Sequence, residues 1–151
     1  MRRIALYGTA TAAVAAAAAG LAISASGQAT PSGATGTRTF VASGGSFKNV
    51  DVKPKGESPG DYFTLSQKLK ENGSSAGSVG AVGTAVTKTV IQFDGTIFLS
   101  DGKVMVAGGG KGNSKTTELA IVGGTGAYAG ASGTFTTVDH GKTTDFTLTF
   151  K

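Results

Sequence analysis

Short runs of alternating apolar and polar residues follow one another along most of the chain, and clusters of Gly, Asn, Asp and Ser separate them. The alternation is clearest near the C-terminus, where polar residues separate Phe146, Leu148 and Phe150. A period of two places the apolar side chains on one face of a β-strand and the polar ones on the other. No segment after residue 37 has a clear helical period. The pattern therefore predicts an all-β protein whose strands each bury one face.

The runs predict about nine strands, of which the first two can be a single broken strand. Asn72-Gly73, Asp101-Gly102 and His140-Gly141 are typical of tight hairpin turns and favour antiparallel neighbours. Asp94-Gly95 falls inside an apolar run, where it predicts either a turn or a bulge. With no helix to cover a second face, about eight strands predict a closed barrel or a sandwich. The expected strands span residues 39–42, 46–52, 61–70, 77–87, 90–99, 103–108, 116–122, 131–138 and 143–150.

Residues 1–29 have the layout of a secretory signal peptide. Arg2 and Arg3 form a short basic start, residues 10–23 are apolar and consist mostly of alanine, and small residues continue to Ala29. This order of basic, apolar and small residues is typical of a Sec-type leader. A transmembrane anchor needs about 20 strongly apolar residues, whereas this run is shorter and interrupted. The sequence therefore predicts export rather than anchoring.

Removal of the leader defines the organisation that we expect for the mature chain. Cleavage is expected after Ala29, with Gly27 and Ala25 as alternative sites. The mature protein is then secreted and has no membrane attachment. Residues 30–37 are small and predict a flexible N-terminal segment. Residues 38–151 are expected to form a single all-β domain, which the resemblance described below makes a β-barrel domain.

Composition and charge exclude several classes of function. The 151 residues include 25 glycines, more than double the usual share of about 7%. The absence of cysteine excludes disulfides, thiolate metal ligands and a cysteine nucleophile. His140 is the only histidine, so few residues are left for catalysis or metal binding. The mature chain has a net charge of about +3, and its lysines are scattered, which argues against a nucleic-acid partner.

Three segments match the pattern of a known family in order and spacing. They are residues 60–69, 101–108 and 119–133, and the third contains Gly-Gly-Thr-Gly-Ala-Tyr-Ala-Gly-Ala-Ser-Gly, from Gly123 to Gly133. Together they resemble the allene oxide cyclase and dirigent superfamily, and this chain is similar to a bacterial, secreted member of it. The resemblance covers residues 60–150 and implies an eight-stranded antiparallel β-barrel. It also implies an apolar or aromatic small molecule held inside the barrel, no metal or organic cofactor, and the homo-oligomers that are frequent in the family.

The resemblance does not extend to the chemistry of the family. Gln67 stands where the allene oxide cyclases have Asn, and Ala85 stands where they have Cys. Ser132 stands where dirigent proteins tend to have Arg and the cyclases Tyr. No Asp or Glu occurs between residues 30 and 50 to match the acidic residue of the family's first strand. The barrel is therefore implied, whereas the reactions known for the plant proteins are not.

These observations lead to one expected function and one alternative. We expect a secreted barrel that binds a small apolar or aromatic molecule in its cavity. If it is an enzyme, it is a cofactor-free cyclase or isomerase, or a dirigent-like template for stereocontrol. The alternative is a non-catalytic extracellular ligand-binding or interaction module. No catalytic residue is identified, and the candidate ligand contacts are Tyr62, Phe63, Leu65, Gln67, Phe93, Met105, Tyr128 and Ser132.

Overall fold

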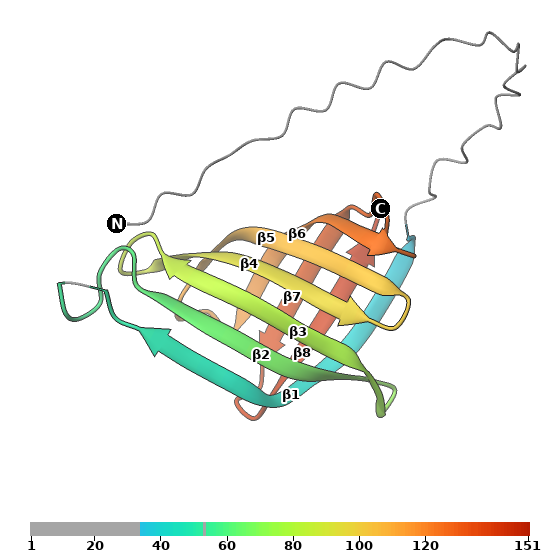
Figure 1. Cartoon of the computed structure of the whole chain (residues 1–151), viewed down its shortest axis with the longest axis horizontal. Coiled ribbons are helices and arrows are strands. Elements are labelled where there is room, and N and C mark those ends of the chain that lie inside the picture. The colour runs from blue at the N-terminus through green and yellow to red at the C-terminus, as the bar shows by residue number, and fades with distance from the viewer. Residues whose placement is uncertain (1–33, 53) are drawn as a thin grey trace, which may run out of the picture.

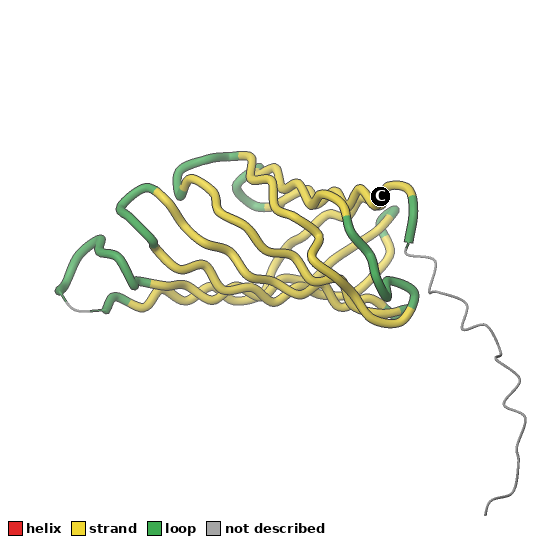
Figure 2. The backbone as a smooth tube through the Cα atoms, turned by 90° about the horizontal axis from the view of Figure 1, so that it is seen from above, coloured by secondary structure: helices red, strands yellow, loops and turns green. Residues whose placement is uncertain are grey.

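Eight antiparallel strands follow one another around a closed barrel in the computed structural model, which describes residues 34–52 and 54–151 (Figure 1). Each strand pairs with its neighbours in sequence, and β1 pairs with β8 to close the barrel. Figure 2 shows that the strands run between loops gathered at the two ends. The predicted all-β, eight-stranded antiparallel barrel is thus confirmed. The strands are β1 (Gly36–Val50), β2 (Tyr62–Glu71), β3 (Ser74–Ala85), β4 (Val90–Leu99), β5 (Gly102–Lys111), β6 (Thr116–Gly126), β7 (Gly133–Asp139) and β8 (Thr143–Phe150).

Two of the sequence expectations fall partly or wholly outside the described residues. The expected signal peptide, residues 1–29, lies there entirely, as does the first half of the expected flexible segment, residues 30–33. β1 already begins at Gly36, two residues before the expected start of the domain. In the described part of the chain, no helix is long and apolar enough to cross a membrane.

The inward faces of the strands fill most of the barrel with apolar side chains. Phe146, Leu148 and Phe150 of β8 are 4%, 0% and 6% exposed, as their alternation predicts. Burying one such side chain contributes about 1.5–3 kcal/mol. The largest fully buried side chains, all with less than 2% exposure, are Phe40, Leu69, Ile97, Leu148 and Val104.

A bulge in β1 reverses which side chains face the interior. The pairing with β2 shifts between Ser43 and Ser46, where Gly44 and Gly45 have φ angles of 63° and 95°. A β-bulge adds one residue to a strand and so changes its alternation. Ala42 faces inward before the bulge, and Phe47 faces inward after it, opposite Leu65 of β2. The two short strands expected here are therefore one strand with a bulge.

The expectation of a turn or a bulge at Asp94-Gly95 is wrong. Both residues lie within β4, and the register with β3 and β5 continues through them without a shift. Gly95 faces the interior, where a Cβ would lie 3.3 Å from side-chain atoms of both Ala81 and Val106. This glycine therefore provides room inside the barrel rather than a turn. The turn expected at Asn72-Gly73 is confirmed, with φ angles of 51° and 82°.

At one end of the barrel, two pairs of neighbouring strands, β1 with β8 and β5 with β6, do not pair along their full length. We call these two gaps in the pairing the seams. β8 pairs with β1 only as far as Ser43, so the end of β1 after the bulge pairs with β2 alone. β6 pairs with β5 only as far as Ala107, so the last four residues of β5 pair with β4 alone. In Figure 1, β1 and β3 accordingly extend beyond β7 and β8.

Candidate functional site

A hollow of about 780 Å³ occupies the end of the barrel where the two seams lie, and we call it the cup. Its walls are the ends of β1 and β3, the start of β2, and the loops that follow β1, β3 and β5. Small-molecule sites in proteins typically have volumes of about 300–1,000 Å³. The cup therefore has the size of a ligand site.

Aromatic rings form one wall of the cup and continue into the barrel. The ring centroids of Phe47 and Phe63 are 5.2 Å apart, and those of Phe63 and Phe93 are 5.9 Å apart with the rings edge to face. Such spacings are those of favourable aromatic pairs. Phe47 nevertheless remains 60% exposed. The barrel thus presents an aromatic surface that no described residue covers.

Glycines on the neighbouring strands make room for these rings. Phe63 and Gly83 are cross-strand partners, and a Cβ on Gly83 would overlap the Phe63 ring. A Cβ on Gly110 would lie 3.1 Å from Cε2 of Phe93, and one on Gly112 would lie 2.9 Å from Cδ1 of Ile91. Part of the glycine excess therefore shapes the aromatic wall and the cup beside it.

The loop between β1 and β2 forms a polar rim that Asp61 holds in place. The Asp61 carboxylate accepts hydrogen bonds from the backbone N–H groups of Val52 (2.8 Å) and Ser58 (2.9 Å) and from the Ser58 hydroxyl (3.2 Å). The bond from the Ser58 N–H is the main reason that the pKa of Asp61 lies below its usual range. The backbone of Asp61 also pairs with Ala85 of β3, through Ala85 N–H to Asp61 O at 2.7 Å. The rim is therefore tied to the barrel at both ends of the loop.

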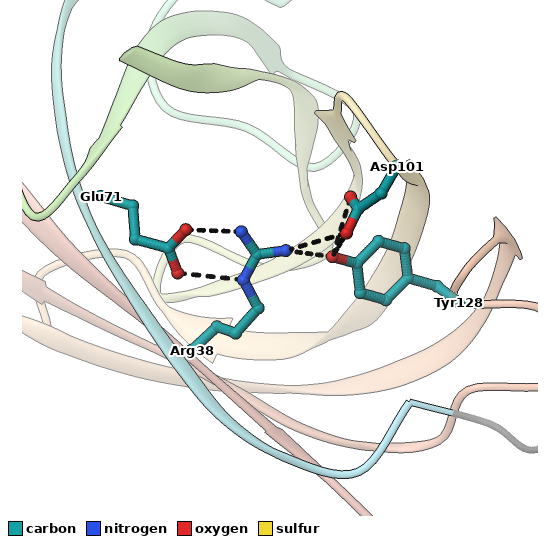
Figure 3. A network of polar contacts seen from close by, with 4 residues as sticks. All are labelled: Arg38, Glu71, Asp101 and Tyr128. Carbon is teal, nitrogen blue, oxygen red and sulfur yellow. Dashed lines mark hydrogen bonds and ion pairs between the residues drawn. The ribbon is translucent and has the colours of Figure 1, made fainter. Parts of the chain in front are cut away.

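A separate polar network closes the opposite end of the barrel. Arg38 lies between Glu71 on one side and Asp101 and Tyr128 on the other (Figure 3). Its guanidinium makes a two-pronged contact with the Glu71 carboxylate, including Nε to Oε1 at 3.0 Å. The Tyr128 hydroxyl lies 3.0 and 2.9 Å from the two Asp101 carboxylate oxygens. Four segments distant in sequence are thereby joined across this end.

The pKa values in this network follow from its contacts. The hydrogen bond with Glu71 raises the pKa of Arg38, and the bond from Arg38 in turn lowers the pKa of Glu71. Burial, followed by the contact with Asp101, raises the pKa of Tyr128. The Tyr128 phenol is thus held between the Arg38 guanidinium and the Asp101 carboxylate at this end of the barrel.

Four of the candidate residues lie in or near the cup. Tyr62 and Phe63 line it directly. Phe93 packs against Phe63 further inside. Leu65 faces inward on β2 below Phe63, as its pairing opposite Phe47 shows.

Gln67 is also on the inward face of β2, between Leu65 and the fully buried Leu69. It lies deeper than the cup and is not among the residues that line it. This candidate therefore faces the barrel interior without contacting the cup.

The other three candidates lie elsewhere. Met105 is expected to line the cavity, but it pairs with Thr96 on the outer face and is 40% exposed, so that expectation is wrong. Its neighbours Val104 and Val106 take the inward positions instead. Tyr128 belongs to the network at the opposite end. Ser132 is exposed, and its carbonyl accepts a hydrogen bond from the N–H of Lys151 at 2.9 Å.

Sequence reasoning missed the contribution of β1 to the cup. Phe47 and Asn49 line it, and both face inward because of the bulge at Gly44 and Gly45. The two consecutive glycines between the strands expected at 39–42 and 46–52 were the available signal. No group of three or more His, Cys, Asp or Glu side chains suited to a metal ion occurs among residues 34–52 and 54–151.

The outer surface of β3–β6 carries a second apolar feature, which we call the outer apolar face. It consists of Val82, Phe98, Met105 and Val122, which are 41%, 42%, 40% and 59% exposed. A shallow hollow of about 540 Å³ lies among three of them and over Gly80. Exposed apolar groups gathered in this way commonly mark a contact surface.

The fold is similar to that of several solved structures. Pyocyanin demethylase matches with a TM-score of 0.72 and 22% identity, over 76% of this chain and 99% of that one. AbnU, an exo-specific intermolecular Diels-Alderase, matches with a TM-score of 0.62 and 13% identity, over 74% and 92%. The pterocarpan synthase dirigent protein GePTS1 matches with a TM-score of 0.58 and 16% identity, over 74% and 82%. The sequence matches no protein-family model and no curated protein. The chain therefore has the eight-stranded antiparallel barrel fold of these solved structures, as its segment from Gly123 to Gly133 predicts.

Proposed function

We propose that the cup binds a small apolar or aromatic molecule. The observation that carries this proposal is the uncovered aromatic wall, in which Phe47 is 60% exposed beside Phe63 in a space of about 780 Å³. Covering apolar surface contributes about 25 cal/mol per Å². A flat ligand against these rings would gain this energy in addition to the stacking contacts.

The cup could also act as a template that directs a reaction of its ligand. Aromatic rings on one side and Gly83 and Ala85 beside them would hold a ligand in a restricted set of orientations. Holding a reactive molecule near its attack geometry removes much of the entropic barrier to its reaction. Solved structures of the same fold include a Diels-Alderase and dirigent proteins, which supports a cofactor-free cyclase, isomerase or dirigent-like role.

A non-catalytic ligand carrier is the second candidate, and one observation favours it. Asp51 and Asp61 are two of the three carboxylates that line the cup, and both accept hydrogen bonds from backbone N–H groups of the rim. At Asp61, where the bond from the Ser58 N–H is the main cause of a lowered pKa, these bonds favour the ionised form and so reduce the capacity of the carboxylate to take up a proton. The cup would then bind a molecule without transforming it.

Thermal-shift screening with aromatic and polyene compounds tests ligand binding at the cup. A compound that binds only the folded state raises the Tm. We expect the shift to disappear in Ala85→Phe, which places a ring inside the cup, and to persist in Ser132→Ala, which changes an exposed residue outside it. An equal shift in Ala85→Phe would overturn the proposal. Mass spectrometry of the compound after incubation then separates an enzyme, which changes it, from a carrier, which does not.

We also propose that residues 1–29 direct Sec-type export and that the protein acts outside the cell. Support comes from the basic, apolar and small-residue order of this segment. The mass of the protein recovered from the culture medium should correspond to a chain that begins at Thr30. Retention of the full-length chain inside the cell would contradict this.

We propose in addition that the outer apolar face joins copies of this chain. Val122 projects beside a hollow over Gly80, and protruding and recessed apolar surfaces of this kind fit together in a homo-oligomer. Light scattering should give a mass that is a multiple of the monomer's, and Val122→Lys should reduce it to the monomer mass. A wild-type monomer at micromolar concentration would overturn the proposal.

A further inference from the structure

We infer that the cup selects a cationic aromatic molecule over a neutral or anionic one of the same size. The positive charge would be a protonated or alkylated ring nitrogen, or an ammonium group attached to the ring. This inference rests on the proposed function, because it concerns the ligand of the same cup.

The charges that line the cup are opposite in sign to those of the chain. The sequence has 14 basic and 9 acidic residues. The residues that line the cup include three carboxylates, from Asp51, Glu57 and Asp61, and one ammonium group, from Lys88. A concave surface with an excess of one charge concentrates the field inside it. The cup would therefore attract a cation, although the protein as a whole repels one.

Two of these carboxylates are fixed in place by neutral donors. Asp61 accepts from the N–H groups of Val52 and Ser58 and from the Ser58 hydroxyl, and Asp51 accepts from the N–H of Gly56 at 3.1 Å. These donors orient the carboxylates but carry no positive charge of their own. Since the pKa of Asp61 is lowered, that group stays ionised in ordinary buffers.

No carboxylate of the cup forms an ion pair with another described residue. Lys55 belongs to the same loop but does not line the cup, and Lys53 lies outside the described residues. Lys88 is on the separate loop between β3 and β4. The described lining thus has two more negative than positive charges.

The aromatic wall adds a second attraction for a cation. Phe47 and Phe63 both line the cup, and the face of an aromatic ring carries partial negative charge. A cation held over such a face is attracted to it, and the attraction strengthens as water is excluded. A neutral ligand would gain only the stacking contact, and an anion would be repelled by the carboxylates. Fixed carboxylates and uncovered rings therefore favour the same ligand.

Fluorescence titration with three probes of one three-ring frame tests the inference at pH 7. The probes are 9-aminoacridinium, which is a cation, 9-(hydroxymethyl)anthracene, which is neutral, and anthracene-9-carboxylate, which is an anion. We expect the cation to bind about tenfold more tightly than the neutral probe, and the anion to bind weakest. The ratio of the Kd of the neutral probe to that of the cation, which we call the advantage of the cation, should fall in about 0.5 M salt, because salt screens the interaction with partly exposed carboxylates.

Charge-neutralising variants locate the source of the selectivity. Glu57→Gln removes an exposed charge, and Asp51→Asn removes a charge while it keeps an oxygen for the Gly56 N–H. Each should reduce the advantage of the cation. Glu118→Gln is the matched control, because Glu118 is exposed on the outside of β6, and it should leave the advantage unchanged.

Ala85→Phe separates failure of the inference from failure of the proposed function. If Ala85→Phe weakens all three probes while the wild type binds them equally, the cup is the site and the charge selectivity is wrong. The inferred source of selectivity is also wrong if the cation is preferred but neither neutralising variant changes the preference. If Ala85→Phe leaves every probe unaffected, the cup is not the site, and both proposals are overturned.

Discussion

Gly83 lies directly opposite Phe63 on the neighbouring strand, and the Phe63 ring occupies the space that a side chain at position 83 would need. Any larger residue must therefore displace the ring toward the cup or strain the strand. We expect Gly83→Val to lower the free energy of unfolding by about 1–3 kcal/mol, the usual cost of overpacking. It should also weaken the binding of aromatic probes. Urea unfolding and fluorescence titration measure the two effects.

Gly80 provides the matched control on the same strand. A Cβ there would lie 3.8 Å from Cε2 of Phe98, an ordinary contact on the outer face. Gly80→Ala should therefore change the free energy of unfolding by less than about 1 kcal/mol and leave probe binding unchanged. Equal losses in Gly83→Val and Gly80→Ala would show that Gly83 has no special relation to the cup.

The sequence predicted the barrel well because its strands repeat a simple physical pattern. Phe146, Leu148 and Phe150 alternate with polar residues, so their burial follows from the period of two. Residues 104–106 are Val-Met-Val, so both faces of that strand are apolar, and alternation could not show that Met105 faces outward.

The site was harder to predict than the fold for two further reasons. A bulge shifts the alternation by one residue, so Phe47 could be assigned to the interior only once the bulge at Gly44 and Gly45 was known. The position of Tyr128 depends on partners far away in sequence, Arg38 and Asp101, which no local pattern reveals.

Tyr128→Phe tests whether this residue acts in closing the barrel or in binding a ligand. The variant removes a hydroxyl that contacts Asp101 and Arg38, and it leaves the ring stacked on Phe150, with centroids 5.5 Å apart. Loss of these bonds to charged groups should lower the free energy of unfolding by about 1–3 kcal/mol. Probe binding at the cup should not change, because the network lies at the other end of the barrel. Weaker binding with unchanged stability would instead assign Tyr128 to the ligand site.

The contact between Glu71 and Arg38 predicts a pH dependence of stability. The folded-state pKa of Glu71 is lowered, so its contribution is present above the unfolded-state pKa of about 4.3 and is lost as the pH falls through the folded-state value. Glu71→Gln should lower the free energy of unfolding at pH 7 by about 0.5–1 kcal/mol and should matter less as the pH is lowered toward 3. Urea unfolding between pH 7 and 3 measures this. Glu57→Gln, which removes an exposed carboxylate of the rim, is the control and should leave the free energy of unfolding at pH 7 unchanged.

The bulge that turns Phe47 inward depends on Gly45 more than on Gly44. Both have positive φ angles, of 95° and 63°, but only at position 45 would a Cβ also overlap the carbonyl oxygen of Ser66. Gly44→Ala should therefore cost about 1 kcal/mol, the penalty for a left-handed conformation, since nothing lies within 4 Å of its Cβ position. Gly45→Ala should cost about 2–4 kcal/mol and should also weaken probe binding, because relief of the overlap moves β1 and with it Phe47. Thermal unfolding and fluorescence titration of the two variants compare these effects. Equal costs, with probe binding intact in both, would show that the direction of Phe47 does not depend on this close approach to β2.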